Sequence, residues 1–201
     1  YIMNRGSQDF LVRPMGIFQL ICYVGIDVCR FIMKVMTEHI DGETLQDDLL
    51  DRMADAGVMG GQRGDGSQKD GFLKYEKGRP AGIYDLQKKG YVMFADGDWA
   101  AKLDEELGPL PEGHSGWRAL LMDPKKDEKL ASYFRNLAES DTLGANLAKA
   151  YLVRSKEIGE KLVEDGVANS VDDVNGVMMN GFYHLYGPIN EHVDLMVDAV
   201  R

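Results

Sequence analysis

A glycine-dense stretch, residues 57–66, is the first part of this sequence whose residue types could do chemistry, because it could cradle a phosphate. Five of its ten residues are glycine. A dinucleotide site needs such glycines directly after a strand and at the start of a helix, where backbone N–H groups meet the pyrophosphate. Here they follow a predicted helix over residues 43–56. The spacing therefore favours a structural loop, and no cofactor-binding residue is assigned.

Metal binding is the second chemistry that these residue types could support. Four aspartates lie in and after the glycine stretch: Asp65, Asp70, Asp96 and Asp98. An EF-hand loop needs oxygen ligands at alternate positions, whereas Lys69 stands among the would-be ligands. The chain has four histidines: His39, His114, His184 and His192. They show no spacing with a third ligand, so no metal ligand and no catalytic residue is assigned, and His192 is expected in a core or interface.

Composition and charge exclude some classes of partner. The net charge of −10 argues against nucleic acid and against an anionic membrane surface, both of which require a basic face. No apolar run approaches the ~20 residues of a membrane-spanning helix. Two cysteines, Cys22 and Cys29, predict buried thiols and a reducing, cytoplasmic setting. The start at Tyr1, without a methionine or a signal peptide, predicts a piece of a longer protein.

The strongest helical pattern lies between residues 17 and 35. Its apolar residues follow steps of three and four, which predicts a stripe facing a core. Gly25 is expected to break the pattern into two helices. The stripe consists of Ile17, Leu20, Ile21, Val24, Val28, Phe31, Ile32 and Val35.

The remaining patterns predict a mostly α fold with a small irregular or β insertion. Two short strands, residues 81–84 and 91–94, could close a hairpin. Ser170 and Asp173 resemble a capping box that opens a short helix. Helices are predicted over residues 99–107, from Asp123-Pro124 onward, over 143–165, and from Ile189 onward.

Two glycine-anchored segments echo each other. Arg13-Pro14-Met15-Gly16-Ile17-Phe18 and His184-Leu185-Tyr186-Gly187-Pro188-Ile189 both open apolar helices, at an offset of 171 residues (187 − 16 = 171). The first, continued by Tyr23-Val24-Gly25-Ile26-Asp27-Val28, resembles the "PMGPFEL-D-VGLD" stretch of the 3-hydroxyacyl-CoA dehydrogenase C-terminal domain. Asp70-Gly71-Phe72-Leu73-Lys74-Tyr75 is similar to the "GFYKY" ending of that domain. Residues 144–146, 164–168, 172–174 and 181–182 resemble its opening.

The resemblance implies a tandem pseudo-repeat of the helical domain, similar to the C-terminal domain of 6-phosphogluconate dehydrogenase. The first copy would cover residues 1–80 without its first helix, and the second residues 124–201. Residues 81–123 would be an insertion or linker. In this family an N-terminal Rossmann domain binds NAD and carries the catalytic histidine–glutamate pair, and neither is found here.

Asn146 is the one substrate-binding residue that the resemblance implies. The family places an asparagine at the start of the long helix, where its amide can bond the substrate. Asn146 lies at the matching position of the second copy, and the alternative is a polar residue at a helix start. Lys125 and Lys126 could attract a CoA phosphate, but the same charges suit a solvated helix start.

Two functions follow as hypotheses. The first is the dimerisation and substrate-cleft domain of an NAD-dependent (3S)-3-hydroxyacyl-CoA dehydrogenase of fatty-acid β-oxidation, inactive on its own. Its partners would be the acyl-CoA, its own Rossmann domain and a second subunit. The alternative is a non-enzymatic helical dimerisation or interaction module.

Overall fold

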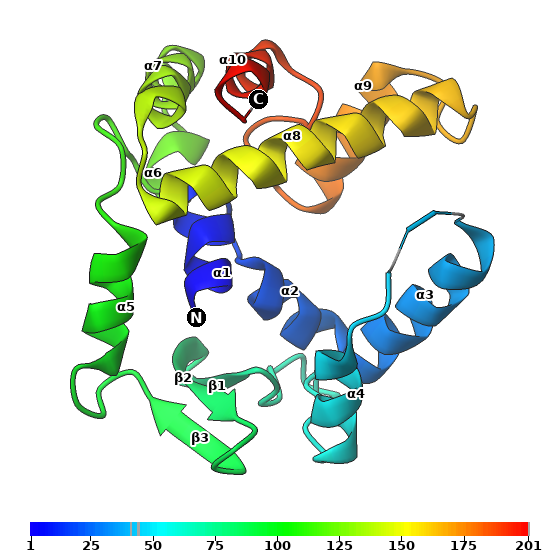
Figure 1. Ribbon diagram of the computed structural model, residues 1–201, viewed down its shortest axis with the longest axis vertical. Helices are drawn as coiled ribbons and strands as arrows, with labels where there is room; N and C mark the ends of the chain where they lie inside the picture. Colours follow the sequence, from blue (N-terminus) through cyan, green and yellow to red (C-terminus); the bar gives the residue numbers. More distant parts are fainter. Residues whose placement is uncertain (41, 44, 201) are drawn as a thin grey trace. The chain divides into compact units, whose positions relative to one another are not determined.

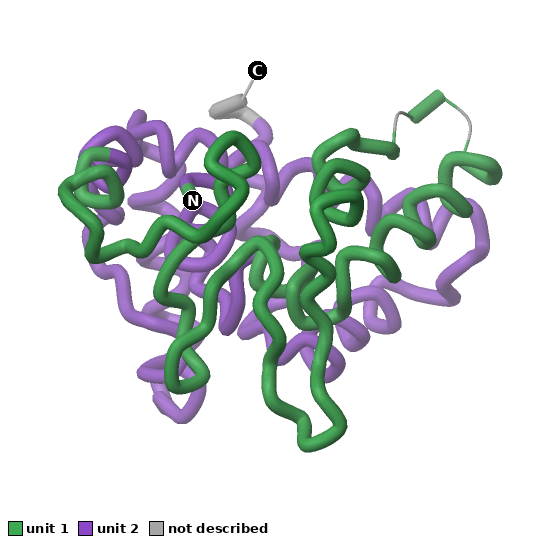
Figure 2. Tube along the Cα trace, turned by 90° about the horizontal axis from the view of Figure 1, so that it is seen from below, with its two compact units in different colours: residues 1, 17–102 green, residues 2–16, 103–201 purple. Residues whose placement is uncertain are grey.

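The computed structural model describes residues 1–40, 42–43 and 45–200, and it divides them into two compact units (Figures 1 and 2). Unit 1 consists of Tyr1 and residues 17–102, and unit 2 of residues 2–16 and 103–201. The division into residues 1–80, 81–123 and 124–201 stays a prediction, and its last residue lies outside the described part of the chain.

Unit 1 combines three helices with a small sheet. Helix α2 (Ile17–Val24) and helix α3 (Ile26–His39) are separated at Gly25, as predicted, and Gly25 has a φ of 115°. Helix α4 (Asp48–Asp55) begins later than predicted, because the Asp47 carboxylate caps it by accepting from the Leu49 N–H at 2.7 Å. The core of this unit gathers Cys22, Ile26, Leu50, Met53, Phe72 and Leu73.

The predicted hairpin is present within a three-stranded antiparallel sheet. Strand β2 (Arg79–Asp85) pairs with β3 (Gly90–Met93), and Tyr84 lies opposite Tyr91. The other edge, β1 (Leu73–Glu76), was not predicted. A tight turn at Lys77-Gly78, with φ values of 50° and 74°, joins it to β2, which is typical of a two-residue hairpin loop.

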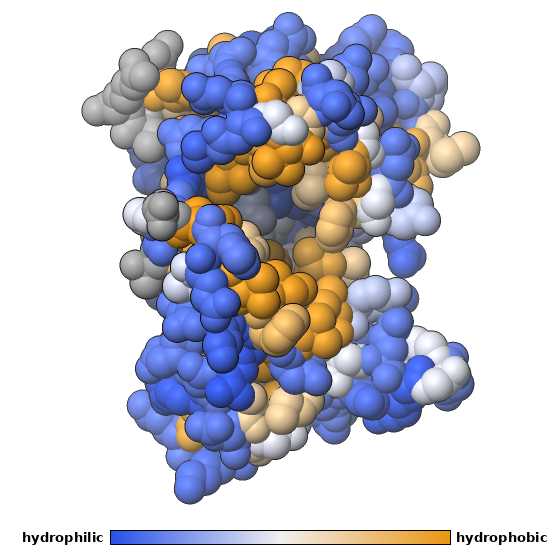
Figure 3. Space-filling view, turned by 90° about the vertical axis from the view of Figure 1, so that its right-hand side faces the viewer, coloured by the Kyte–Doolittle hydropathy of each residue, from blue (hydrophilic) through white to orange (hydrophobic). Residues whose placement is uncertain are grey.

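The apolar stripe was predicted to face a core, and this is wrong along α3. Its α2 members Ile17, Leu20 and Ile21 are half-buried, and Ile21 packs against the core of unit 1. Phe31 is 67% exposed, and its neighbours along α3 are also exposed. Orange surface in Figure 3 shows apolar side chains gathered on the face that includes this helix. We call the exposed set the α3 face: Val24, Val28, Phe31, Ile32, Val35 and Met36. Periodicity identifies an apolar side of a helix but not what covers it.

Unit 2 is helical throughout its elements. Its longest helix is α8 (Leu143–Glu164), which Thr142 caps by accepting from the Ala145 N–H at 3.2 Å. Helix α10 (Glu191–Val200) packs against both α7 (Lys126–Glu139) and α8 (Figure 1). The other elements are α1 (Ile2–Arg5), η1 (Gly6–Phe10), α6 (Trp117–Leu121), α9 (Val171–Gly176) and η2 (Val177–Gly181). Helix α5 (Trp99–Leu107), predicted with these bounds, leads into this unit from unit 1.

The core of unit 2 follows the predicted inner faces. Leu130, Tyr133, Phe134 and Leu137 of α7 are almost completely buried, as the helical spacing predicts. The predicted helix start at Ser170 is confirmed, because its hydroxyl accepts from the Asp173 N–H at 3.2 Å. The Asp173 carboxylate accepts from the same hydroxyl, at 3.0 Å. Apolar burial of this kind stabilises by about 25 cal/mol per Å² and fixes the helices that surround the candidate site.

The sequence echo corresponds to a repeat of local structure within unit 2. The π-helices η1 and η2 are related by the same 171-residue offset. Val12 and Tyr183, which end these turns, share the offset and have φ values of 49° and 55°. A Cβ at Gly16 would lie 2.4 Å from the Asn4 Oδ1, and one at Gly187 would lie 2.1 Å from the Asn175 Oδ1. Each π-helix is therefore followed by a glycine, and an asparagine side chain packs against that glycine where any Cβ would clash.

Two tyrosines hold the first segment of the chain in unit 2. The buried hydroxyl of Tyr133 donates to the Phe10 carbonyl at 2.8 Å, and that of Tyr186 donates to the Leu11 carbonyl at 2.7 Å. Leu11 is completely buried. These bonds satisfy backbone carbonyls that would otherwise be buried without a partner.

Both cysteines are free; Cys22 is buried as predicted, whereas Cys29 is only half-buried. Cys22 is buried, and burial raises the pKa of its thiol to about 11, so the thiolate is rare at neutral pH. Among the described helices, none combines the length and the apolar character that crossing a bilayer demands.

Candidate functional site

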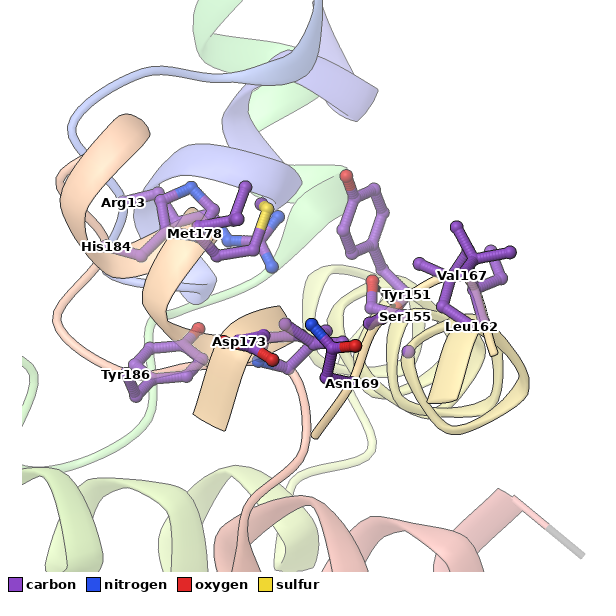
Figure 4. A pocket seen from close by; sticks show the side chains of 16 residues that line it. Arg13, Tyr151, Ser155, Leu162, Val167, Asn169, Asp173, Met178, His184 and Tyr186 are labelled. Atoms are coloured by element: carbon purple, nitrogen blue, oxygen red, sulfur yellow. Dashed lines mark hydrogen bonds between the residues drawn. The ribbon is translucent and has the colours of Figure 1, made fainter. Parts of the chain in front are cut away.

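A cavity of about 450 Å³ opens along the second half of α8 and lies entirely within unit 2. Helix α8 forms one wall from Tyr151 to Leu162, and α9 with η2 forms another. Figure 4 shows Arg13, His184 and Met178 on one side of the cavity, across from Leu162 and Val167. Its size falls within the usual range of small-molecule sites.

Arg13 is the unusual residue of this cavity. Its side chain is only 9% exposed, and within the described residues its Nε has no hydrogen-bond partner. The guanidinium lies over the ring of Tyr151, with 4.7 Å from Cζ to the ring centroid. The residue follows the left-handed Val12 and precedes Pro14, which restricts Arg13 to extended backbone. The repeated turn therefore aims this cation into the cavity.

His184 and Tyr186 enter the cavity from the second copy of the turn. Burial, with a smaller effect of the nearby Arg13 charge, lowers the pKa of His184 from 6.5 to about 4. Burial raises the pKa of Tyr186, and the Arg13 guanidinium acts against that rise. At neutral pH the imidazole is therefore uncharged and the phenol is protonated, which leaves the guanidinium as the cation on this side of the cavity.

The pH dependence of stability should follow from His184. Because the unfolded chain takes up a proton near pH 6.5 and the folded chain only near pH 4, the free energy of unfolding should fall as the pH decreases through this range. Above pH 6.5 the effect should vanish. Urea unfolding at a series of pH values would measure it, and a His184→Gln variant should show a flatter profile. An imidazole NMR titration with a midpoint near 6.5 in the folded protein would contradict the prediction.

Two of the other polar side chains of the cavity are already engaged. The Ser155 hydroxyl donates to the Tyr151 carbonyl at 2.7 Å, and an Asp173 carboxylate oxygen accepts from the Ser170 hydroxyl at 3.0 Å. Most of the remaining lining is apolar. This lining suits an apolar molecule that carries a polar group.

The predicted substrate-binding Asn146 lies at the other end of α8. Its side chain is exposed, and its amide donates to the Asp141 carbonyl at 3.2 Å. Its role in substrate binding stays a prediction. Lys125 precedes α7 and Lys126 begins it, which agrees with the helix-start alternative.

The glycine-dense stretch is a loop between α4 and β1, so it neither follows a strand nor opens a helix. It packs against the end of α2: the Gly61 N–H donates to the Cys22 carbonyl at 2.7 Å, and the Gln68 side-chain amide donates to the same carbonyl at 2.7 Å. A Cβ at Gly60 would lie 2.9 Å from this oxygen. The loop therefore completes the C-terminus of a helix.

The aspartates and histidines do not form a metal site within the described residues. Asp65 accepts from the N–H and the hydroxyl of Ser67, which makes it part of a local turn. His192 stacks on Phe134 with ring centroids 5.3 Å apart, as expected of a core histidine. His114 packs edge-on against Tyr133 and contacts the Asp9 carbonyl.

Arg13 and the cavity were missed by sequence reasoning. The residues that line it lie far apart in the chain, and their spacing carries no local periodicity. The one available signal was the echo itself, because Arg13 and His184 occupy the same position relative to their glycines. They are 171 residues apart (184 − 13 = 171).

Comparison with known proteins identifies the first part of the chain. The family model described as "3-hydroxyacyl-CoA dehydrogenase, C-terminal domain" matches residues 8–86. This stretch runs from η1 to just past the end of β2 and contains the Pro14-Met15-Gly16 motif. Neither a curated protein nor a solved structure gives a significant match. Residues 8–86 are therefore similar to the C-terminal domain of 3-hydroxyacyl-CoA dehydrogenases.

Proposed function

We propose that this chain is the helical part of an NAD-dependent (3S)-3-hydroxyacyl-CoA dehydrogenase of fatty-acid β-oxidation. In this role it forms subunit contacts and one wall of the acyl-CoA cleft, and hydride transfer to NAD belongs to a separate Rossmann domain. The observation that carries the proposal is the family match over residues 8–86. It is supported by the sheet, which is antiparallel in its described strands, whereas a Rossmann domain is built on parallel ones.

The first test is dehydrogenase activity. We expect the 201-residue chain alone to produce no NADH from a 3-hydroxyacyl-CoA, as followed by absorbance. Fusion to the Rossmann domain of an NAD-dependent 3-hydroxyacyl-CoA dehydrogenase should bring activity above that of the Rossmann domain alone. NADH formation by the chain alone would overturn the assignment of the chemistry to a separate domain.

A second test concerns the substrate wall and Asn146. Titration with acetoacetyl-CoA should give saturable binding, which Asn146→Ala should weaken roughly tenfold if its amide bonds the substrate. Asn180→Ala, also exposed in unit 2, is the matched control and should leave binding unchanged. Equal effects of the two substitutions would remove Asn146 from the substrate site.

The alternative is an interaction module whose function is dimerisation. The specific observation in its favour is the α3 face, since contiguous exposed apolar surface marks contact sites. Phe31→Glu should then reduce self-association in sedimentation experiments. Self-association without any binding of acetoacetyl-CoA would favour this module over the dehydrogenase domain.

A further inference from the structure

The Arg13 cavity contains a charge that the described protein groups do not fully satisfy. Burying a cation without an anionic partner is costly, and most buried arginines are therefore paired. Among the described residues no carboxylate forms an ion pair with Arg13, and its Nε lacks an acceptor. The Tyr186 hydroxyl is a neutral hydrogen-bond partner of the guanidinium and does not balance its charge. The ring of Tyr151 offsets part of the cost from one face of the guanidinium. The Nε–H of Arg13 is therefore a hydrogen-bond donor without an acceptor, at the wall of an open cavity.

The groups around Arg13 determine what charge a ligand must carry to pair with its guanidinium. His184 is neutral at pH 7, so the guanidinium offers one positive charge. Asp173 also lines the cavity, and its carboxylate would repel a second negative charge. The forked donors of an arginine can bind a carboxylate or a phosphate. With one guanidinium and the Asp173 carboxylate in the lining, a ligand with a single negative charge suits the cavity better than a phosphate dianion.

The remaining lining defines the rest of the ligand. Ile158, Leu162, Val167, Val174 and Val177 make the wall beyond the guanidinium apolar. In Figure 4, Leu162 and Val167 lie across the cavity from Arg13. An apolar chain attached to the carboxylate would therefore cover these side chains and gain from their burial.

We propose that this cavity binds a monocarboxylate with a medium-length apolar chain, whose carboxylate accepts hydrogen bonds from Arg13. The site is distinct from the predicted contact at Asn146, at the other end of α8, and it does not depend on the dehydrogenase role. The ligand class is that of a free fatty acid, since the thioester of an acyl-CoA lacks the negative charge at this position.

The experiment titrates the 201-residue chain with octanoate, 1-octanol and octanoyl-CoA at pH 7, followed by calorimetry. Octanoate should bind. Octanol has the same chain without the charge and should bind more weakly, by at least roughly tenfold. Binding of octanoyl-CoA alone would overturn the proposal. Binding of octanoate without acyl-CoA would support this site while removing support for the proposed substrate wall, so the two can fail separately.

Variants place the ligand at the guanidinium. Arg13→Met should weaken octanoate binding at least roughly tenfold and leave octanol binding unchanged, and Arg13→Lys should have an intermediate effect. Arg154→Met is the matched control, because Arg154 is an exposed arginine of α8 already paired with Glu157. It should bind octanoate as the unaltered chain does. Equal octanoate affinity in Arg13→Met and Arg154→Met would overturn the proposal.

A measurement on the unaltered chain covers the case in which Arg13→Met does not fold. Octanoate should shift the ¹⁵N–H resonance of the Arg13 Nε, and it should raise the pKa of His184 by adding negative charge beside it. Octanol should do neither. Absence of any change in the Arg13 resonance at saturating octanoate would contradict the assignment of this residue as the carboxylate partner.

Discussion

Gly187→Ala should destabilise the protein by about 3 kcal/mol, because overpacking and two lost hydrogen bonds act together. A Cβ at this position would lie 2.1 Å from the Asn175 Oδ1, which real contacts do not allow. Asn175 cannot move away freely, since its side-chain amide donates to the Ile189 carbonyl at 2.9 Å and its Oδ1 accepts from the Ile189 N–H at 3.0 Å. Urea unfolding at pH 7 would measure the change.

Gly181→Ala is the matched control for this prediction. It ends η2 in the same unit, has no atom within 4 Å of the added Cβ, and has no left-handed backbone. Its effect should stay within about 0.5 kcal/mol. Similar losses for the two glycines would show that the approach of Asn175 does not set the cost.

Phe134→Ala should cost about 3–5 kcal/mol, because it opens a cavity in the core of unit 2. Phe134 is completely buried, and its ring meets Tyr186 edge-on at 4.9 Å and stacks on His192. Loss of this ring should also loosen Tyr186, whose hydroxyl anchors Leu11. The measurement is the urea midpoint combined with near-UV circular dichroism.

Phe31→Ala provides the comparison, since the same atoms are removed from a side chain that is 67% exposed. Its effect on the free energy of unfolding should stay within about 0.5 kcal/mol. A loss as large as that of Phe134→Ala would mean that the α3 face is buried in solution, for example against a second copy.

Helices whose apolar side faces a core of neighbouring residues could be predicted from the sequence. Helix α5 has the predicted bounds, and the inner residues of α7 are those given by the 3.6-residue period. Helix α3 shows the limit of the same rule: its apolar period is correct, but the stripe is exposed. Periodicity is a property of one helix, whereas burial depends on the partner that covers it.

Features that depend on distant residues could not be predicted. Strand β1 is only four residues long and is defined by its pairing with β2. The Arg13 cavity requires a turn near the start of the chain to meet residues 151–188. The sequence did predict that the glycine-dense stretch is a loop, because local order alone excludes the strand-to-helix context that a nucleotide site needs.

The discontinuity of unit 2 has a consequence for folding during synthesis. Residues 2–16 belong to this unit but emerge before all of residues 17–102, which form most of unit 1. The carbonyls of Phe10 and Leu11 must then remain without these donors until Tyr133 and Tyr186 have been synthesised. Unit 1 can therefore fold on the ribosome before unit 2 closes around its first segment. Until then Phe10, Leu11 and Val12, which are buried in the folded unit 2, remain exposed.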